Sequence, residues 1–258
     1  MKTPTTHTIV FTLLTLICLG TTSGCALNRP YPEKISYMPD LTFEKSKDPH
    51  PLPYRIKVRN SGVSAPFEGK SFVYRLPDGQ WEKDFYNEWF AYPRDMITDS
   101  CISALIQSAN FISITSEDSL MEADYYLEGR LLESYLDRRN SNHLQSVLKI
   151  RWMLIQYQSP KRGNSSDENW ARTYEEITPL QSNQVEDYVA STGTGLKKIL
   201  HQLIMDLNQQ SIHLVRLMIL QLLLEQMNLL IEKKHTPMKL LHLRPMLHLH
   251  LQKLHLSQ

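Results

Sequence analysis

Three cysteines are the side chains of this 258-residue chain with the greatest scope for covalent chemistry. Cys18 lies inside an apolar N-terminal run, Cys25 follows a short stretch of small residues, and Cys101 stands further along the chain. A secreted domain that depends on disulfides usually contains four or more cysteines, so a single Cys25–Cys101 bridge is the less economical interpretation. Cys25 is therefore either an incidental residue of a discarded leader or the residue that holds the protein to a membrane.

The N-terminus has the features of a leader. Residues 1–7 carry one Lys and no acid, and residues 9–20 form an apolar run of 12 residues that ends in small residues. A membrane-spanning helix needs about 20 apolar residues, so this run is too short to span. Its length and flanks are those of a signal peptide. We therefore expect residues 1–24 to be a signal peptide and the protein to be exported, in a bacterium.

The sequence Thr22-Ser23-Gly24-Cys25 resembles a bacterial lipobox, with Thr22 in place of the usual Leu. This resemblance implies that Cys25 is the first mature residue and carries acyl chains on its sulfur and its amine. Two or three chains anchor a protein stably where one would be marginal. The alternative is cleavage elsewhere by ordinary signal peptidase. Because Ala26 and not Asp follows Cys25, the resemblance implies the outer membrane, with the protein facing the periplasm.

The rest of the chain predicts a tether followed by a folded domain. Residues 25–53 contain six prolines and predict a lipidated, extended tether, within which residues 34–41 could still pair as a short edge strand. Period-2 and period-3.6 patterns then separate strands from helices. The expected strands cover 54–60, 71–76, 81–90, 111–116, 123–139, 143–158 and 170–180, and the expected helices cover 92–110 and 183–210. We expect 71–90 and 123–158 to form antiparallel hairpins.

The order strands, helix, strands, helix predicts an α+β fold. In this fold two main helices lie on one face of a mostly antiparallel sheet. Cys101 falls on the apolar stripe of the first helix, which favours a buried small hydrophobic residue over a reactive thiol. Gly193 and Gly195 lie inside the second helix and predict either a kink or a close contact between helix and sheet.

The tail, residues 211–258, differs in composition from the domain. It holds six of the ten histidines and no Gly or aromatic residue. Three interpretations stay open: an extension of the helix, a poorly ordered low-complexity end, or a reading-frame artefact. A closed metal site needs three or four ligands in fixed geometry, and no Cys or acid stands beside the HLH sequence at 248–250 to complete one. We therefore predict no metal site.

No motif for catalysis is present. The chain lacks a Gly-rich phosphate loop, an HExxH motif, a nucleophile elbow and a CxxC pair, so we predict neither an enzyme nor a cofactor. The formal charge of +1 gives no general attraction to nucleic acid. We interpret Asp124, Glu128 and Glu133 as solvent-facing acids. Four arginines form either a basic strip or part of a solvated sheet face: Arg130, Arg138, Arg139 and Arg151.

Several segments together resemble one family. They are Cys25, the extended segment with Tyr37, FVYRLPDGQWEKDFYNEWFAYPRDMITDSCISALIQSANF (72–111), EADYYLEGRLLESYLD (122–137), LKIRWMLIQYQ (148–158) and the helix from Asn183. Over residues 25–210 the chain is similar to the ABC-type transport auxiliary lipoproteins, the PqiC/YmbA-like family. The resemblance implies that residues 54–210 form the auxiliary lipoprotein domain, with a fold like the N-terminal domain of TolB.

The resemblance also implies a function. It predicts an outer-membrane accessory component of an intermembrane lipid transport system, which docks the periplasmic assembly of MCE-domain proteins to the outer membrane. The implied partners are an MCE-domain protein with its permease or ABC components, and further copies of this chain in a ring. The alternative is an outer-membrane lipoprotein that activates a cell-wall synthase or assists assembly of a secretion or flagellar apparatus.

Overall fold

The structure, a computed structural model, describes residues 33–47, 49, 51–156 and 170–234. The chain divides into two compact units, residues 1–33 and 34–258, and every described helix and strand belongs to the second. The predicted signal peptide and Cys25 lie outside the described residues, as do residues 235–258 of the tail.

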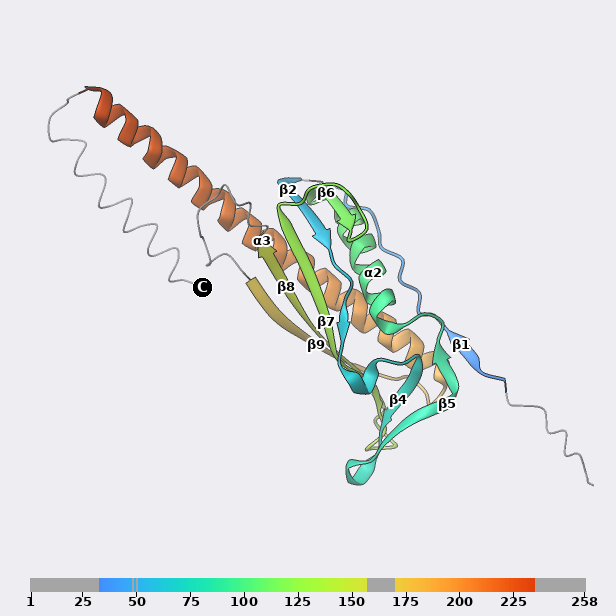
Figure 1. The fold of residues 1–258 in the computed structure, drawn as a ribbon. Coiled ribbons are helices and arrows are strands. Elements are labelled where there is room, and N and C mark those ends of the chain that lie inside the picture. The colour runs from blue at the N-terminus through green and yellow to red at the C-terminus, as the bar shows by residue number, and fades with distance from the viewer. Residues whose placement is uncertain (1–32, 48, 50, 157–169, 235–258) are drawn as a thin grey trace, which may run out of the picture. The chain divides into compact units, whose positions relative to one another are not determined.

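The described ranges contain nine strands, two α-helices and two short 3₁₀ turns (Figure 1). The strands are β1 (Ile35–Tyr37), β2 (Leu52–Val58), β3 (Gly62–Val63), β4 (Ser71–Arg75), β5 (Trp81–Trp89), β6 (Phe111–Ser116), β7 (Tyr125–Asp137), β8 (Gln145–Gln156) and β9 (Trp170–Pro179). The helices are α2 (Pro93–Ser108) and α3 (Val185–Lys234), and the 3₁₀ turns are η1 (Ala65–Phe67) and η2 (Pro77–Gly79).

The sheet is organised around β7, the longest strand. On one edge β7 pairs antiparallel with β8, and β8 pairs antiparallel with β9. On its other edge β7 pairs in turn with three short parallel strands, β2, β3 and β4. Beyond these, β6 lies parallel to β2, β5 lies antiparallel to β4, and β1 lies parallel to β5. The two predicted hairpins, β4–β5 and β7–β8, are therefore present.

The prediction of an α+β fold is confirmed, and the pairing of the strands adds to it. The two longest ladders, β7–β8 and β8–β9, are antiparallel, but five of the eight pairs are parallel, which the sequence did not indicate. Parallel neighbours need a crossover connection. Here α2 lies in the connection that returns the chain from β5 to β6, next to β2.

Both helices pack on the same side of the sheet. α2 contacts β6 and β7, α3 contacts β8 and β9, and the two helices contact each other (Figure 1). The predicted apolar face of β8, made of Leu148, Ile150, Trp152 and Leu154, is no more than 3% exposed. The stripe of α3 packs against it through Leu196, Ile199, Leu200, Leu203 and Leu207. A second cluster, which includes Phe72, Trp89 and Tyr188, lies near the start of α3.

The predicted tether is not extended along its whole length. Its residues 35–37 form β1, and Leu41 and Phe43 pack against the main core. A Cβ at Gly193 would lie 2.9 Å from Cβ of Pro39, and one at Gly195 would lie 3.4 Å from Oγ1 of Thr178 on β9. The two glycines therefore allow close contacts, one with the tether segment and one with the sheet. Packing thus begins about twenty residues before the predicted domain boundary at residue 54.

Helix α3 continues past the predicted end at residue 210. Residues 211–234 extend it, in agreement with the first of the three interpretations of the tail. Within the described residues, no helix combines the length and the apolar character that crossing a membrane requires.

Candidate functional surfaces

The predicted lipidation site, Cys25, lies outside the described residues. The other cysteine expected in the mature chain, Cys101, is 0% exposed and belongs to the main core. Burial raises the pKa of its thiol well above the ordinary value. The prediction that Cys101 is a buried hydrophobic residue is therefore confirmed, and its thiol is not accessible to a reagent or a partner.

The outward face of the sheet carries paired charges. Arg55 donates to Asp124 at 2.9 Å, and Arg59 donates to Glu128 at 2.5 Å. Glu133 lies 3.7 Å from Lys149. Exposed pairs of this kind contribute about 0–1 kcal/mol each. The three acids, predicted to face solvent, are partly buried, and their charges are offset by neighbouring cations.

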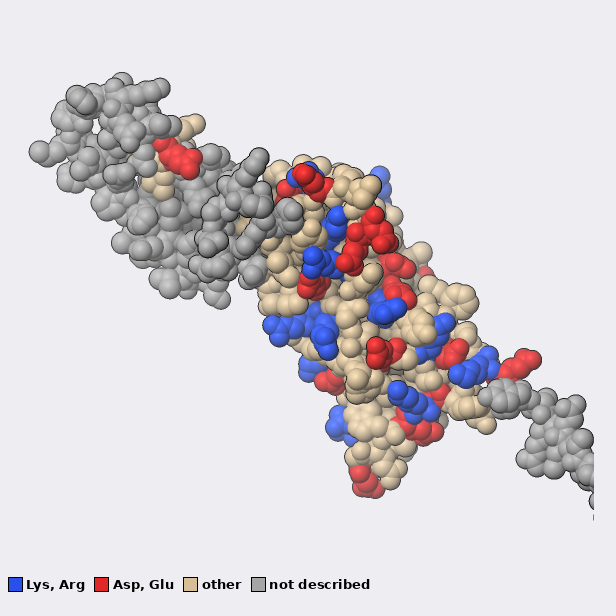
Figure 2. All heavy atoms as spheres, in the orientation of Figure 1, with Lys and Arg blue, Asp and Glu red and all other residues tan. Residues whose placement is uncertain are grey.

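The four predicted arginines do not form a single strip. Arg130 and Arg151 are exposed and lie directly opposite each other on β7 and β8. The guanidinium carbon of Arg138 lies 3.9 Å from the ring centroid of Tyr74, and Arg139 pairs with Asp137 at 2.6 Å. Figure 2 shows Lys and Arg side chains interspersed with Asp and Glu side chains over the visible face. The interpretation as a mixed, solvated face is the one that this arrangement supports.

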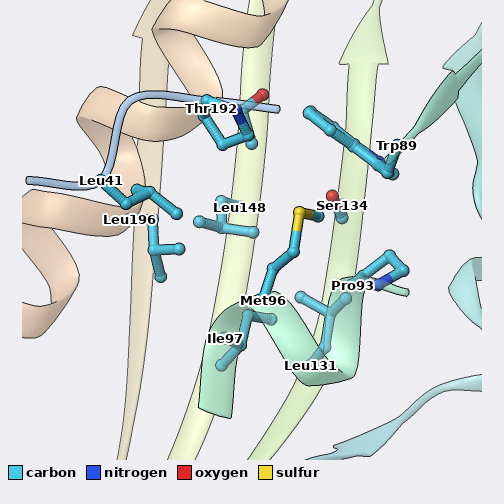
Figure 3. Close-up of a pocket in the computed structure, with 11 residues that line it drawn as sticks. Leu41, Trp89, Pro93, Met96, Ile97, Leu131, Ser134, Leu148, Thr192 and Leu196 are labelled. Carbon is cyan, nitrogen blue, oxygen red and sulfur yellow. The ribbon is translucent and has the colours of Figure 1, made fainter. Parts of the chain in front are cut away.

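An apolar cavity lies between the helices and the sheet. Met96 of α2 points between Leu148 of β8 and Ser134 of β7, and Leu196 of α3 lines another side (Figure 3). The volume is ≈ 20 Å³, which is room for about one water molecule, and apolar cavities of this kind stay dry. We interpret the cavity as a packing gap and not as a binding site.

A larger hollow lies beside the β4–β5 hairpin. It has a volume of ≈ 530 Å³ and is lined by Phe67, Val73 and Trp81, among others. The ring centroids of Trp81 and Tyr135 lie 5.0 Å apart, and Arg75 lies 5.4 Å from the ring of Trp81. The hollow could take an apolar side chain or ligand group. The sequence reasoning did not single it out, because its walls come from three separate segments.

A cluster of exposed apolar side chains surrounds β1, which is the last strand at this end of the sheet. We call this cluster the aromatic edge and define it as Ile35, Met38, Tyr86, Phe90 and Tyr92. Each of the five side chains is between 47% and 64% exposed. Exposed apolar residues are ordinary when isolated, whereas a contiguous group often marks an interaction surface.

A bulge in β5 exposes part of this edge. The Asp84 carboxylate accepts hydrogen bonds from the backbone N–H groups of Tyr86 at 2.7 Å and of Asn87 at 2.9 Å. Burial opposes ionisation of Asp84, but hydrogen bonds from Tyr74, Asn87 and Tyr86 outweigh it and hold its pKa below the usual value. The turn directs Phe85 and Tyr86 outward, where their rings meet edge to face at 5.3 Å and each is about half exposed.

Comparisons with known proteins identify the fold but no family. No family model and no curated protein matches the chain. Among solved structures, a protein of Xanthomonas campestris described under the family model DUF330 matches with a TM-score of 0.58 and 15% identity, over 68% of this chain and 96% of that one. An uncharacterized protein (TM-score 0.48, 16% identity, 64% of this chain and 99% of that one) is a more distant match. So is the hypothetical protein CT253 of Chlamydia trachomatis (0.43, 10%, 61% and 98%).

The match to the Xanthomonas campestris protein shows that the two chains share a fold. At 15% identity it shows nothing further about activity or partners. The coverage of that chain, 96%, means that the likeness extends over the whole of its structure and not over a common sub-motif.

Proposed function

We propose that this chain is an exported lipoprotein of the outer membrane that serves as an accessory component of an intermembrane lipid transport system. In this role it docks a periplasmic assembly of MCE-domain proteins to the outer membrane, as a ring of several copies. The proposal treats the protein as a structural component that binds partners and performs no catalysis.

One observation supports the proposal most: the order of the parts along the chain. A predicted signal peptide precedes a sequence that resembles a lipobox at Cys25, and the domain that follows has the fold of a protein described under DUF330. The PqiC/YmbA-like lipoproteins, which the sequence resembles, are related to DUF330. The likeness in fold and the resemblance in sequence thus favour the same group of proteins, although neither names a lipid or a partner.

The anchor has a direct chemical test. We expect the first mature residue to be Cys25 and the mass of the N-terminal peptide to include acyl chains. We also expect Cys25→Ala to leave the domain folded and to move it from the membrane fraction to the soluble periplasm. Retention of the variant in the membrane fraction, or an unmodified Cys25 in the wild-type protein, would contradict the anchor.

The role in transport is tested by binding between purified components. The chain is mixed with the MCE-domain protein of the same organism, and separately with its cell-wall synthases, and complexes are detected by light scattering after size-exclusion chromatography. We expect a complex with the MCE-domain protein. A complex with a cell-wall synthase alone would favour the alternative function given above.

A further inference from the structure

We propose that the aromatic edge rests on the surface of the membrane to which the chain is anchored. This inference rests on the proposed lipid anchor at Cys25 and adds to it a defined orientation of the domain. It predicts that the β1–β5 end of the sheet faces the lipid headgroups. β4 pairs near the end of β7, whereas β2, which carries β6, pairs near its start, so β6 is expected to lie away from the membrane.

Strand pairing explains why the side chains of Met38 and Phe90 point away from the core. Tyr37 of β1 pairs with Trp89 of β5, and Trp89 is 3% exposed. The N–H of Phe90 donates to the carbonyl oxygen of Tyr37 at 2.8 Å, so the pairing extends to the end of β5. Because side chains alternate along a strand, Met38 and Phe90 lie on the side opposite to Tyr37 and Trp89. Their exposures of 60% and 64% follow from this register.

The aromatic edge continues around both sides of β1. Ile35 pairs with Asn87, which directly follows Tyr86 in the β5 bulge, and Ile35 is 53% exposed. Met38 is three positions after Ile35, a distance of about 10 Å along a strand. Ile35 shares the side of Tyr37 and Met38 lies on the opposite side, so the aromatic edge borders both sides of β1.

Cations accompany the aromatic rings. Lys70 donates to the carbonyl oxygen of Phe90 at 2.8 Å, and its ammonium nitrogen lies 5.2 Å from the ring centroid of Tyr92. Arg94 lies 5.7 Å from the same ring. Aromatic residues with Lys and Arg beside them are characteristic of the boundary between water and lipid, because rings insert among headgroups while long cationic side chains reach phosphate.

The charges on this edge are nearly balanced. Lys34 pairs with Glu88 at 3.0 Å and Arg94 pairs with Asp95 at 3.2 Å. Lys70 forms no ion pair with any residue in the described part of the chain. Burial of the apolar side chains, and not a strong attraction to anionic lipid, is therefore the main favourable contribution expected at this surface.

The length of the chain brings this edge close to the anchor. Ile35 is ten positions after Cys25, and a fully extended segment of that length spans at most about 33–36 Å. With Cys25 held at the headgroups, β1 cannot move further than this from the membrane. This short covalent reach, together with the side-chain composition, favours the membrane over a second copy or a partner protein as the occupant.

The experiment compares two labelled positions in the lipidated, full-length protein. Phe90→Cys places a thiol on the aromatic edge, and Ile112→Cys places one on β6; both native side chains are 64% exposed. Cys101 is 0% exposed and Cys25 is acylated, so an environment-sensitive fluorophore reacts with the new thiol alone. Each protein is reconstituted into vesicles of phosphatidylethanolamine with a minor fraction of phosphatidylglycerol.

We expect the label at residue 90 to emit at shorter wavelength in vesicles than in detergent. A quencher attached to lipid should reduce its emission several-fold more than that of the label at residue 112, and a water-soluble quencher should show the opposite order. Equal quenching at the two positions overturns the inference. Protection of residue 90 that persists in detergent and follows self-association also overturns it, in favour of an interface between copies.

The mass of the N-terminal peptide separates the two possible failures. If Cys25 carries its acyl chains and residue 90 remains in water, the orientation is wrong and the proposed anchor stands. If Cys25 is not acylated, the anchor itself is wrong and the orientation that depends on it is overturned as well. Circular dichroism of both variants verifies that the substitutions leave the fold intact.

Discussion

Replacing Gly129 with Ala would place a methyl group where the indole ring of Trp152 lies. Gly129 on β7 pairs directly with Trp152 on β8. A Cβ at residue 129 would lie 2.6 Å from Cζ3 of Trp152 and 2.8 Å from Oγ of Ser61. Trp152 is 0% exposed and is surrounded by the main core, so the ring has no free space to enter.

The expected cost follows from this overlap. Overpacking a core by one methyl group costs about 1–3 kcal/mol. For a protein of this size, each kcal/mol lowers the melting temperature by about 2–4 °C. We therefore expect Gly129→Ala to lower the free energy of unfolding by about 1–3 kcal/mol. The assay is urea unfolding of the unacylated Cys25→Ala chain, followed by circular dichroism.

Two further variants test the reason for the cost. At Gly69 the nearest heavy atom to an added Cβ is 4.0 Å away, so we expect Gly69→Ala to change the unfolding free energy by no more than about 0.5 kcal/mol. Trp152→Phe makes room beside residue 129, so the double variant should lose less stability than the sum of the single variants. If Gly129→Ala is as stable as Gly69→Ala, or if the double variant is merely additive, the close packing of β7 against Trp152 is refuted.

Three other predictions follow from single features of the domain. Ala109 ends α2 with a φ of 51°. Because Gly adopts positive φ without strain, Ala109→Gly should raise the free energy of unfolding, measured by thermal unfolding, by about 0.5–1 kcal/mol. Burial and the hydrogen bond to Asp206 raise the pKa of Tyr174 above its ordinary 10.0. As pH rises, the Tyr174 hydroxyl therefore ionises in the unfolded chain before it ionises in the folded protein. The free energy of unfolding should fall as pH rises above 10, and it should fall less steeply in Tyr174→Phe. Among the α3 side chains that the structure describes, Leu207 is the last buried one, so deletion of 211–258 should leave urea unfolding cooperative.

Local patterns in the sequence predicted most of the secondary structure. Alternation of apolar and polar residues predicted β2 and β8. The Pro-Asp-Gly sequence marked the turn between β4 and β5, where Asp78 and Gly79 have φ values of 59° and 76°. Helical spacing placed Cys101 and the α3 leucines in the core. These features depend on neighbours within a few residues, which is why one sequence was enough to find them.

Features that depend on distant segments were not predicted. The parallel pairing of β2, β3 and β4 with β7 depends on the connection that contains α2. Local sequence patterns do not predict such a pairing. The prolines of residues 25–53 indicated a tether, but Leu41 and Phe43 pack because the helices provide a surface for them. The aromatic edge was missed because it combines β1, the β5 bulge and the start of α2. Adjacent Phe85 and Tyr86, which interrupt the alternation of β5, were the one local signal for it.

The proposed function requires the protein to work beside an MCE-domain protein. The most direct measurement is capture of the full-length lipoprotein from its native membranes in mild detergent, with the co-purifying proteins identified by mass spectrometry. We expect recovery of an MCE-domain protein together with a permease or ABC component. Recovery of a cell-wall synthase or a secretin, with no MCE-domain protein, would contradict the proposed function while leaving the fold unchanged.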